Sequence, residues 1–309
     1  MVATLRFVYS LMIASSLLAL AGCARGDNDS TTEGATRSLA ELARRGDVEG
    51  VRLAIANGAD LERCDELGLT PIHYASLAGH PEIVGLLLDG GCPPDLQDQA
   101  VSGTPLHHAA GTIKPTRAYA GPFEGRRAVI ERLLEEDVSI DSRIPQGPTA
   151  LCWAVRNADY EMASWLIDNG ARPDQAIEGR TLLHVLSSSI GTVRGNEQQL
   201  TGLLVQNGVA IDALDSDGQT ALYRAVAEGL PVMALALLEH GASPNLTDKN
   251  GNAPIHKAVE YGNIEVVKAL LENEADLTLR GHLWKTPLEL ARDRGHTELV
   301  ELLERAADE

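Results

Sequence analysis

Residues 70–91 read TPIHYASLAGHPEIVGLLLDGG, and this stretch indicates two short helices separated by a glycine. Thr70 can cap the first helix through its hydroxyl, with Pro71 tolerated just inside. Gly79 is typical of a helix end. The apolar residues of EIVGLLLDG recur at helical spacing and predict the second helix. One such pair cannot bury its own apolar face, so we expect similar units stacked beside it.

The same pattern recurs along the chain. Residues 253–273 read APIHKAVEYGNIEVVKALLEN, and a further copy reads TPLELARDRGHTELVELLE from residue 286. Seven copies begin 32 to 45 residues apart, at positions 70, 104, 149, 181, 220, 253 and 286. Turn segments such as DSDGQ at 215–219 connect them. A repeat of this length predicts an all-α solenoid of helix-turn-helix units joined by hairpin-like turns.

The period and the threonine-proline-leucine-histidine opening resemble ankyrin repeats over residues 38–309. The resemblance implies an N-terminal cap at 38–65, which lacks the opening, and seven repeats from about 66 to 309. Two residues after an opening, Ile255 and Leu288 are expected in the core between stacked helices. In this family the histidine three residues after the opening bonds to neighbouring backbone, which implies structural roles for His73, His107, His184 and His256.

The N-terminus holds an apolar run of 16 residues between Arg6 and Cys23. A transmembrane helix needs about 20 such residues, and nothing nearby would cover a buried helix. A basic start, an apolar middle and small residues are typical of a signal peptide. Leu20-Ala21-Gly22-Cys23 also resembles the lipobox of bacterial lipoproteins, which implies a signal peptide at 1–22. An ordinary signal peptide with a chance cysteine is the alternative.

The lipobox resemblance implies that Cys23 carries the lipid and that residues 24–37 form a flexible tether to the membrane. Residue 24 is alanine, whereas an aspartate there is associated with retention in the inner membrane of enteric bacteria. We therefore expect a lipid-anchored protein that faces the periplasm from the outer membrane.

Charge restricts the class of partner. The chain has 44 acidic and 26 basic side chains, for a formal net charge of −18. Such a balance disfavours nucleic acid and anionic lipid head groups, and it favours encounter with a basic protein. Of the cysteines besides Cys23, Cys64 and Cys92 lie near the edges of one repeat. A disulfide between these two and a set of free thiols both fit.

Motifs of catalysis or metal binding are missing from the sequence. No nucleophile motif and no glycine-rich phosphate loop after a strand is found. DSDG at 215–218 is similar to the start of a calcium loop, but position 12 of that loop is Val226 rather than glutamate. His107 and His108 are adjacent and should point in different directions from a helix. We expect no enzyme activity, no metal and no cofactor.

Ankyrin-repeat proteins bind partners mainly through turn tips and the exposed side of the first helices. Mapped onto this sequence, that surface implies partner-binding roles for Leu67, Leu69, Leu77, Arg156, Asn157, Gln219, Asn252, Tyr261, Trp284 and Lys285. Trp284 replaces the glycine usual at its turn, so it either fills a gap or anchors a partner. Leucines exposed at a tip would be hard to explain without a partner.

A second candidate is the insertion at 111–127, GTIKPTRAYAGPFEGRR, which is basic and carries Tyr119 and Phe123. We expect it between the two helices of its repeat. Loops on rigid scaffolds often carry function. The alternative is a tolerated surface insertion whose aromatic side chains merely pack down onto the repeats.

Taken together, these features predict a monomeric, non-enzymatic scaffold that binds protein at the bacterial envelope. One hypothesis is an inhibitory or immunity-type binder of a periplasmic protein. The other is a supportive scaffold for envelope or oxidative-stress maintenance.

Overall fold

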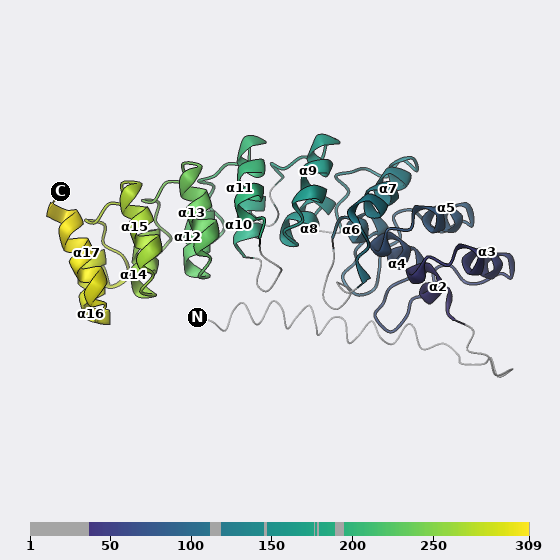
Figure 1. Ribbon diagram of the computed structural model, residues 1–309, viewed down its shortest axis with the longest axis horizontal. Coiled ribbons are helices and arrows are strands. Elements are labelled where there is room, and N and C mark those ends of the chain that lie inside the picture. Colours follow the sequence, from purple (N-terminus) through teal and green to yellow (C-terminus); the bar gives the residue numbers. More distant parts are fainter. Residues whose placement is uncertain are drawn as a thin grey trace. The chain divides into compact units, whose positions relative to one another are not determined.

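The computed structural model describes residues 37–111, 119–144, 147–175, 177, 179–188 and 195–308, with the backbone alone at Leu283. Within these residues the secondary structure is helical, apart from two isolated bridges at Arg143–Thr149 and Ile177–Arg180. Figure 1 shows the helices arranged in successive pairs. The predicted all-α solenoid of helix-turn-helix units is confirmed.

The first helices of the pairs are α2 (Leu39–Arg45), α4 (Pro71–Ala78), α6 (Pro105–Ala110), α8 (Ala150–Arg156), α10 (Leu182–Ser187), α12 (Ala221–Ala227), α14 (Pro254–Glu260) and α16 (Pro287–Arg294). The second helices are α3 (Val48–Ala56), α5 (Pro81–Asp89), α7 (Phe123–Leu134), α9 (Tyr160–Asp168), α11 (Glu197–Gln206), α13 (Pro231–Glu239), α15 (Ile264–Glu272) and α17 (Thr297–Asp308). A 3₁₀ turn, η2 (His282–Trp284), precedes α16.

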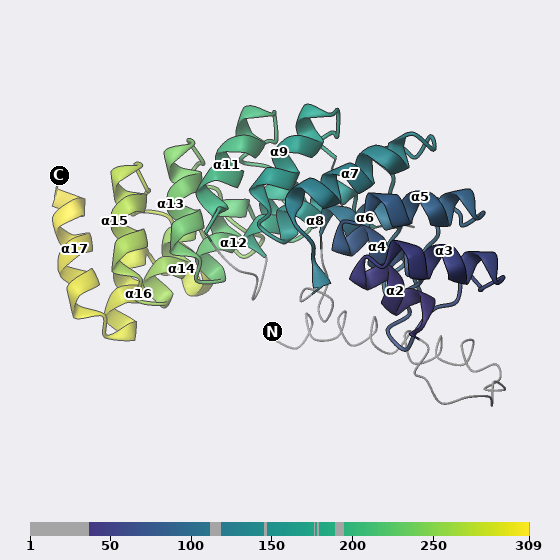
Figure 2. The ribbon, with the colours of Figure 1, turned by 45° about the vertical axis from the view of Figure 1, so that its right-hand side comes forward.

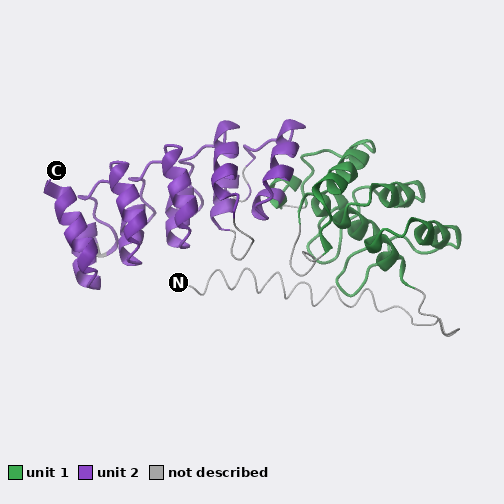
Figure 3. Ribbon diagram, in the orientation of Figure 1, with its two compact units in different colours: residues 1–153 green, residues 154–309 purple. Residues whose placement is uncertain are grey.

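The chain divides into two compact units, residues 1–153 and 154–309, drawn in green and purple in Figure 3. In the first unit, α4 packs between α2 and α6, and α5 packs between α3 and α7. In the second unit, the first helices α10, α12, α14 and α16 contact one another in order. The second helices α11, α13, α15 and α17 form a parallel row, which Figure 2 shows from another side.

The first helices other than α8 each begin after a small polar or small apolar residue with extended backbone. Thr70, Thr104 and Thr286 are followed by proline at the first helical position, where no N–H bond is lost. Gly79 and Gly295 end α4 and α16 in the left-handed conformation that glycine adopts without strain. These signals keep the first helices to two turns.

Second helices are capped in a different way. The side chains of Asp47, Asp159 and Asn263 accept backbone N–H groups from the first turn of α3, α9 and α15. Pro81 and Pro231 begin α5 and α13. One face of each second helix is buried, whereas every residue of α4 and α6 is buried.

The insertion in the second repeat differs from its predicted extent. Residues 112–118 lie outside the described part of the chain, and Phe123 already begins helix α7. Residues 123–127 of the predicted insertion therefore belong to a helix. The backbone N–H of Gly121 donates to the carbonyl of Leu77 at 2.9 Å, so the end of the insertion covers the end of α4.

Two other expectations concern cysteine and the membrane. Cys92 is a buried thiol outside any disulfide, so a Cys64–Cys92 disulfide does not form, and Cys64 is not a free thiol either. Burial raises the pKa of the Cys92 thiol to about 12 and keeps it protonated. Among the helices of the described residues, none is long and apolar enough to cross a membrane. The predicted signal peptide, Cys23 and most of the tether lie outside the described residues.

Candidate protein-binding surface

Four histidines join consecutive repeats. In each, a backbone N–H three residues earlier donates to ring Nδ1 across 3.1–3.4 Å, so Nε2 must carry the proton. Nε2 then donates to a carbonyl of the next repeat across 2.8–3.1 Å. The pairs are His73–Leu96, His107–Pro148, His184–Gln219 and His256–Leu279. The structural role implied for these histidines is confirmed.

Burial controls the protonation of these rings. It lowers the pKa of His73 to about 3 and that of His107 to about 4, although the carbonyl each ring contacts raises the pKa in part. Burial also lowers the pKa of His184 and His256. The four imidazoles are therefore neutral near pH 7, as the hydrogen-bond pattern requires.

An aspartate holds each of four hairpins in shape. Its Oδ1 accepts two backbone N–H groups of the hairpin at 2.7–3.1 Å. Its Oδ2 accepts a side-chain donor from a first helix, and that donor differs between repeats. The pairs are Asp65 with Tyr74 at 2.6 Å, Asp98 with His108 at 2.8 Å, Asp215 with Arg224 at 2.7 Å and Asp248 with Tyr223 at 2.9 Å.

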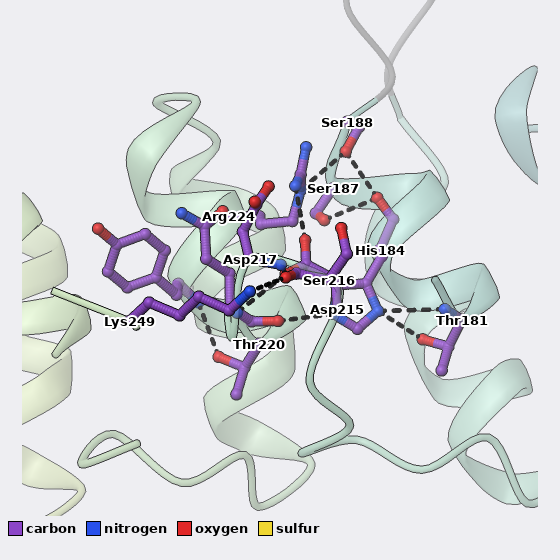
Figure 4. Close-up of polar contacts among 12 residues, drawn as sticks. Thr181, His184, Ser187, Ser188, Asp215, Ser216, Asp217, Thr220, Arg224 and Lys249 are labelled. Atoms are coloured by element: carbon purple, nitrogen blue, oxygen red, sulfur yellow. Dashed lines mark hydrogen bonds and ion pairs between the residues drawn. The ribbon is translucent and has the colours of Figure 1, made fainter. Parts of the chain in front are cut away.

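Figure 4 shows the network around Asp215. Arg224 donates from Nη1 to Asp215 and from Nε to the Ser188 hydroxyl at 3.1 Å, and that hydroxyl donates to the carbonyl of His184 at 2.8 Å. Burial raises the pKa of Asp215, but the N–H of Gln219 and the Arg224 guanidinium together bring it below the usual value. The hairpin is thereby fastened to two helices, α12 and α10.

One cluster in the first unit carries metal-ligand chemistry. His73, Asp98 and His108 are buried, and a potential ligand atom of each lies within 4.8 Å of the others. Both ring nitrogens of His73 already make hydrogen bonds, and His108 Nε2 bonds to Asp98. His108 thus stands where Tyr74 and Arg224 stand in other repeats, so hairpin bracing accounts for its Nε2 bond, whereas its buried Nδ1 has no hydrogen-bond partner among the described residues. The divergence of His107 and His108 is as expected, because His107 bonds to Pro148 instead.

Hairpin tips present apolar side chains to solvent. Leu67 is 38% exposed and Val101 is equally so. Tyr261, which follows the last residue of α14, is 58% exposed, and Trp284 is 80% exposed. Large apolar side chains exposed on a framework braced in this way are typical of interaction surfaces.

Trp284 also has an unusual backbone. Its φ is +60°, whereas Gly68, Gly218 and Gly251 occupy the same hairpin position with φ between +72° and +81°. For an L-residue the left-handed region costs about 1–2 kcal/mol. The substitution of glycine by tryptophan therefore adds backbone strain to the cost of an exposed indole.

Family models match the repeats that the sequence predicts. A model of ankyrin repeats in three copies matches residues 39–114, 192–281 and 234–308, and a model of a single ankyrin repeat matches residues 146–176. These matches cover more than half of the chain. The chain belongs to the ankyrin-repeat family. Ankyrin repeats are protein-interaction scaffolds, generally without catalytic activity, so the hairpin tips and first helices form the candidate binding surface.

Relatives share the repeats over part of their length. The chain is 27% identical to ankyrin repeat protein nuc-2 of Neurospora crassa, over 65% of this chain and 17% of that protein. It is 32% identical to a transient receptor potential cation channel subfamily A member 1 homologue of Caenorhabditis elegans, over 64% and 15%. It is 30% identical to palmitoyltransferase AKR1 of Lachancea kluyveri, over 55% and 21%. The chain spans under a quarter of these relatives.

Two residues predicted on the ankyrin binding surface are buried. Leu69 is 1% exposed, because it immediately precedes the helix cap Thr70 and an apolar residue there packs toward the helix. Leu77 is fully buried, because α4 contacts α2, α5, α6 and α7 and the Gly121 segment covers its end. The prediction that these leucines face a partner is wrong.

The aromatic residues of the insertion contact the repeats, although Tyr119 remains 36% exposed. Tyr119 lies edge-on to Tyr74, with ring centroids 6.1 Å apart, and beneath the Arg44 guanidinium at 4.7 Å. Phe123 is half-buried at the start of α7. Arg126 is buried and donates to the carbonyls of Gly121 and Ala109. For the described part of the insertion, the structure favours the alternative of a surface loop that packs onto the repeats.

The other predicted residues are partly accessible. Arg156 is exposed and Asn157 half-buried at the end of α8. Gln219 and Asn252 are half-buried, and the Asn252 Oδ1 accepts the backbone N–H of His282 at 2.8 Å. Lys285 pairs with Asp293. Asn252, Trp284 and Lys285 come together around the last hairpin.

The ankyrin surface expected from the sequence also runs through Asn250 and His282, whereas sequence reasoning missed Arg280. Asn250, Arg280 and His282 line a cavity of about 280 Å³ together with Gly251, Gly281 and Trp284. One signal was available, since Gly281 and Trp284 replace the aspartate and glycine found in other hairpins. The cavity itself depends on two successive hairpins lying side by side, which the sequence does not report.

Proposed function

We propose that this ankyrin-repeat protein is a protein-binding scaffold tethered to the bacterial envelope through a lipid on Cys23. The observation that carries the binding role is the braced hairpin series, in which the Asp65 and Asp98 hairpins carry the exposed apolar tips Leu67 and Val101. Asp65, Asp98, Asp215 and Asp248 each fix a hairpin, so that tip residues are held in place before a partner arrives. Preorganisation of this kind reduces the entropy lost on binding.

The anchor rests on the sequence of the N-terminus. Leu20-Ala21-Gly22-Cys23 supports lipidation at Cys23, and Ala24 supports an outer-membrane position facing the periplasm. A diacylglycerol together with an acylated amine gives two or more chains, and two chains anchor a protein stably where one does not. The residues up to 37 would then keep the repeats near the membrane.

For the biological role, we favour an inhibitory or immunity-type binder of a periplasmic protein. Its support is the family's use as a masking or docking surface, together with the absence of any catalytic motif from the sequence. A supportive scaffold for envelope or oxidative-stress maintenance is the second candidate. The net charge of −18 supports fast encounter with a basic partner in either role.

Fractionation and cross-linking test the anchor and the binding role separately. Wild type should sediment with outer membranes, while Cys23→Ser should leave the membrane pellet or stay uncut, because the lipidated thiol is gone. Cys152→Ser, a buried thiol, is the matched control and should still sediment. Cross-linking in intact cells should capture one protein partner at stoichiometric yield. An unprocessed wild-type chain, or a soluble one, would refute the anchor, and a complete lack of captured protein would refute the scaffold.

A further inference from the structure

Trp284 combines two features that both cost free energy in the free protein. Its φ of +60° lies in the region that glycine occupies in three other hairpins and Ser102 in a fourth, and its side chain is 80% exposed. Two hydrogen bonds fix this backbone: Trp284 donates to the carbonyl of Gly281 at 3.0 Å, and Arg280 Nη1 donates to the Trp284 carbonyl at 2.6 Å. Strain held by surrounding bonds is typical of binding sites, and exposed tryptophan is typical of hot spots.

Beside the indole lies the cavity of about 280 Å³ between the hairpin tip at Asn250–Gly251 and the last hairpin, residues 280–285. Small-molecule pockets run from about 300 to 1,000 Å³, so this one suits one or two side chains of a partner. Among its described lining groups are a guanidinium, an amide and an imidazole, and none is a carboxylate. The lining therefore offers hydrogen-bond donors and positive charge.

Arg280 is the charged group of this lining. Its Nη1 makes both recorded contacts, to the Trp284 carbonyl and to Glu289 at 3.2 Å, and its side chain is half exposed. Nε and Nη2 have no hydrogen-bond partner within the described chain, which leaves one edge of the guanidinium for a planar carboxylate. Lys249, on the neighbouring tip, bonds to the Ser216 carbonyl of the preceding hairpin and is not among the residues that line the cavity.

We infer that the last hairpin docks an extended acidic segment of a partner protein, with a carboxylate side chain on Arg280 and an adjacent apolar side chain on the Trp284 ring. This inference rests on the proposed scaffold function and specifies one subsite of it. The chain as a whole is acidic, but fields are screened within about 8 Å at physiological salt. Groups in contact with the segment therefore decide what is bound, and the guanidinium of Arg280 is the charged group among them.

A random peptide library displayed on phage tests the inference. Linear twelve-residue peptides are selected on the immobilised full chain, with Trp284→Gly as counter-selection. Selected peptides should contain Asp or Glu beside an apolar residue and should bind Trp284→Gly at least about 30-fold more weakly, the size of a hot spot. Val232→Ala, which truncates another exposed apolar side chain on α13, is the matched control and should bind like wild type.

The carboxylate contact needs its own test, because loss of the indole does not report on charge. A selected peptide and its Glu→Gln analogue are titrated against wild type and Arg280→Gln in a double-mutant cycle. The analogue should bind wild type at least about 10-fold more weakly than the parent peptide, but the two should bind Arg280→Gln alike. Equal losses in both proteins would overturn the pairing.

Other outcomes also decide the matter. Selection of basic peptides, of peptides that need a free C-terminus, or of peptides insensitive to Trp284→Gly would overturn the inference. Circular dichroism of each variant excludes unfolding as the cause. If Trp284→Gly still captures the natural partner in cross-linked cells, the scaffold proposal stands and the docking subsite is wrong. If no protein is captured even by wild type, the scaffold proposal itself fails.

Discussion

The imidazole of His256 donates to the carbonyl of Leu279 across 3.1 Å, and the same ring accepts the N–H of Ala253. One side chain thus caps its own helix α14 and joins it to the segment that leads to α16. Because the ring is buried, we expect water not to replace its hydrogen bonds to the Ala253 N–H and the Leu279 carbonyl if the ring is removed.

His256→Leu should therefore destabilise the second unit by about 1–3 kcal/mol, the cost of burying unsatisfied polar groups. Urea unfolding followed by circular dichroism measures the loss. His282→Ala removes an exposed histidine from the same region and should change stability by less than about 0.5 kcal/mol. Equal effects of the two substitutions would mean that the His256 bonds contribute nothing.

Acid should destabilise the first unit before its carboxylates are protonated. His73 and His107 have folded-state pKa values of about 3 and 4, below the value of 6.5 expected when unfolded. The unfolded state then binds more protons, so their contribution is present above about pH 6.5 and is lost as pH falls toward 4.

A fall from pH 7 to pH 5 should lower the free energy of unfolding by about 2 kcal/mol for each of these two histidines. Urea titrations at the two pH values measure it. His107→Gln keeps an amide donor but removes one titration, so its stability should fall less over this interval. A wild-type stability that is the same at pH 7 and pH 5 would contradict the buried neutral state.

Gly121→Ala should destabilise the first unit by about 1–3 kcal/mol through overpacking. A Cβ at Gly121 would lie 1.9 Å from the carbonyl oxygen of Ala78, which is helix backbone and cannot move alone. Gly85→Ala in α5 is the matched control, since the nearest atom there is the Arg132 Nε at 3.7 Å. This control should gain up to about 1 kcal/mol from helix propensity, and thermal melts distinguish the two.

Trp284→Gly should stabilise the second unit by up to about 1 kcal/mol, since glycine adopts φ of +60° without strain. The entropy of a more flexible unfolded chain offsets part of this gain. Gly251→Ala is the reverse change at the equivalent position and should cost about 1 kcal/mol. If the Trp284→Gly variant has a Tm well below that of wild type, packing of the indole stabilises the protein by more than the backbone strain at Trp284 destabilises it.

Arg224→Met should cost about 3–5 kcal/mol, because it leaves the buried carboxylate of Asp215 without its cation. Adding Asp215→Asn should recover part of the loss, as the amide oxygen still accepts the N–H groups of Asp217 and Gln219. Chemical denaturation of both variants at pH 7 measures this recovery. A double variant no more stable than the single one would argue against an uncompensated charge.

The order of helices could be predicted from sequence because each unit carries its own signals. A threonine opening, a glycine between the helices and helical spacing of apolar residues act within about 20 residues of chain. The histidine ties were expected from the resemblance to ankyrin repeats, since histidine recurs at the family's position in four units. Local chemistry repeated at a constant period needs no knowledge of distant contacts.

The solvent exposure of individual side chains could not be predicted, because it depends on which neighbouring segments pack against each repeat. Ile255 and Leu288 occupy the same position of the repeat and were both expected in the core. Ile255 is fully buried between neighbours, whereas Leu288 is half-buried in the last first helix, α16. Leu77 shows the opposite error, since the returning Gly121 segment covers a helix side that other repeats leave open.

The amino-acid sequence by itself thus determined the repeat and its caps, which follow from short-range hydrogen bonding and periodic burial, while the histidine ties were expected from the family resemblance. Only the tertiary structure decided which leucines reach solvent, that Asp98 and His108 form a buried pair, and that Asn250, Arg280 and Trp284 surround one cavity. These relationships join residues from different repeats or from segments folded back on one another. Their distances are set by the packing of whole helices, which the local pattern does not contain.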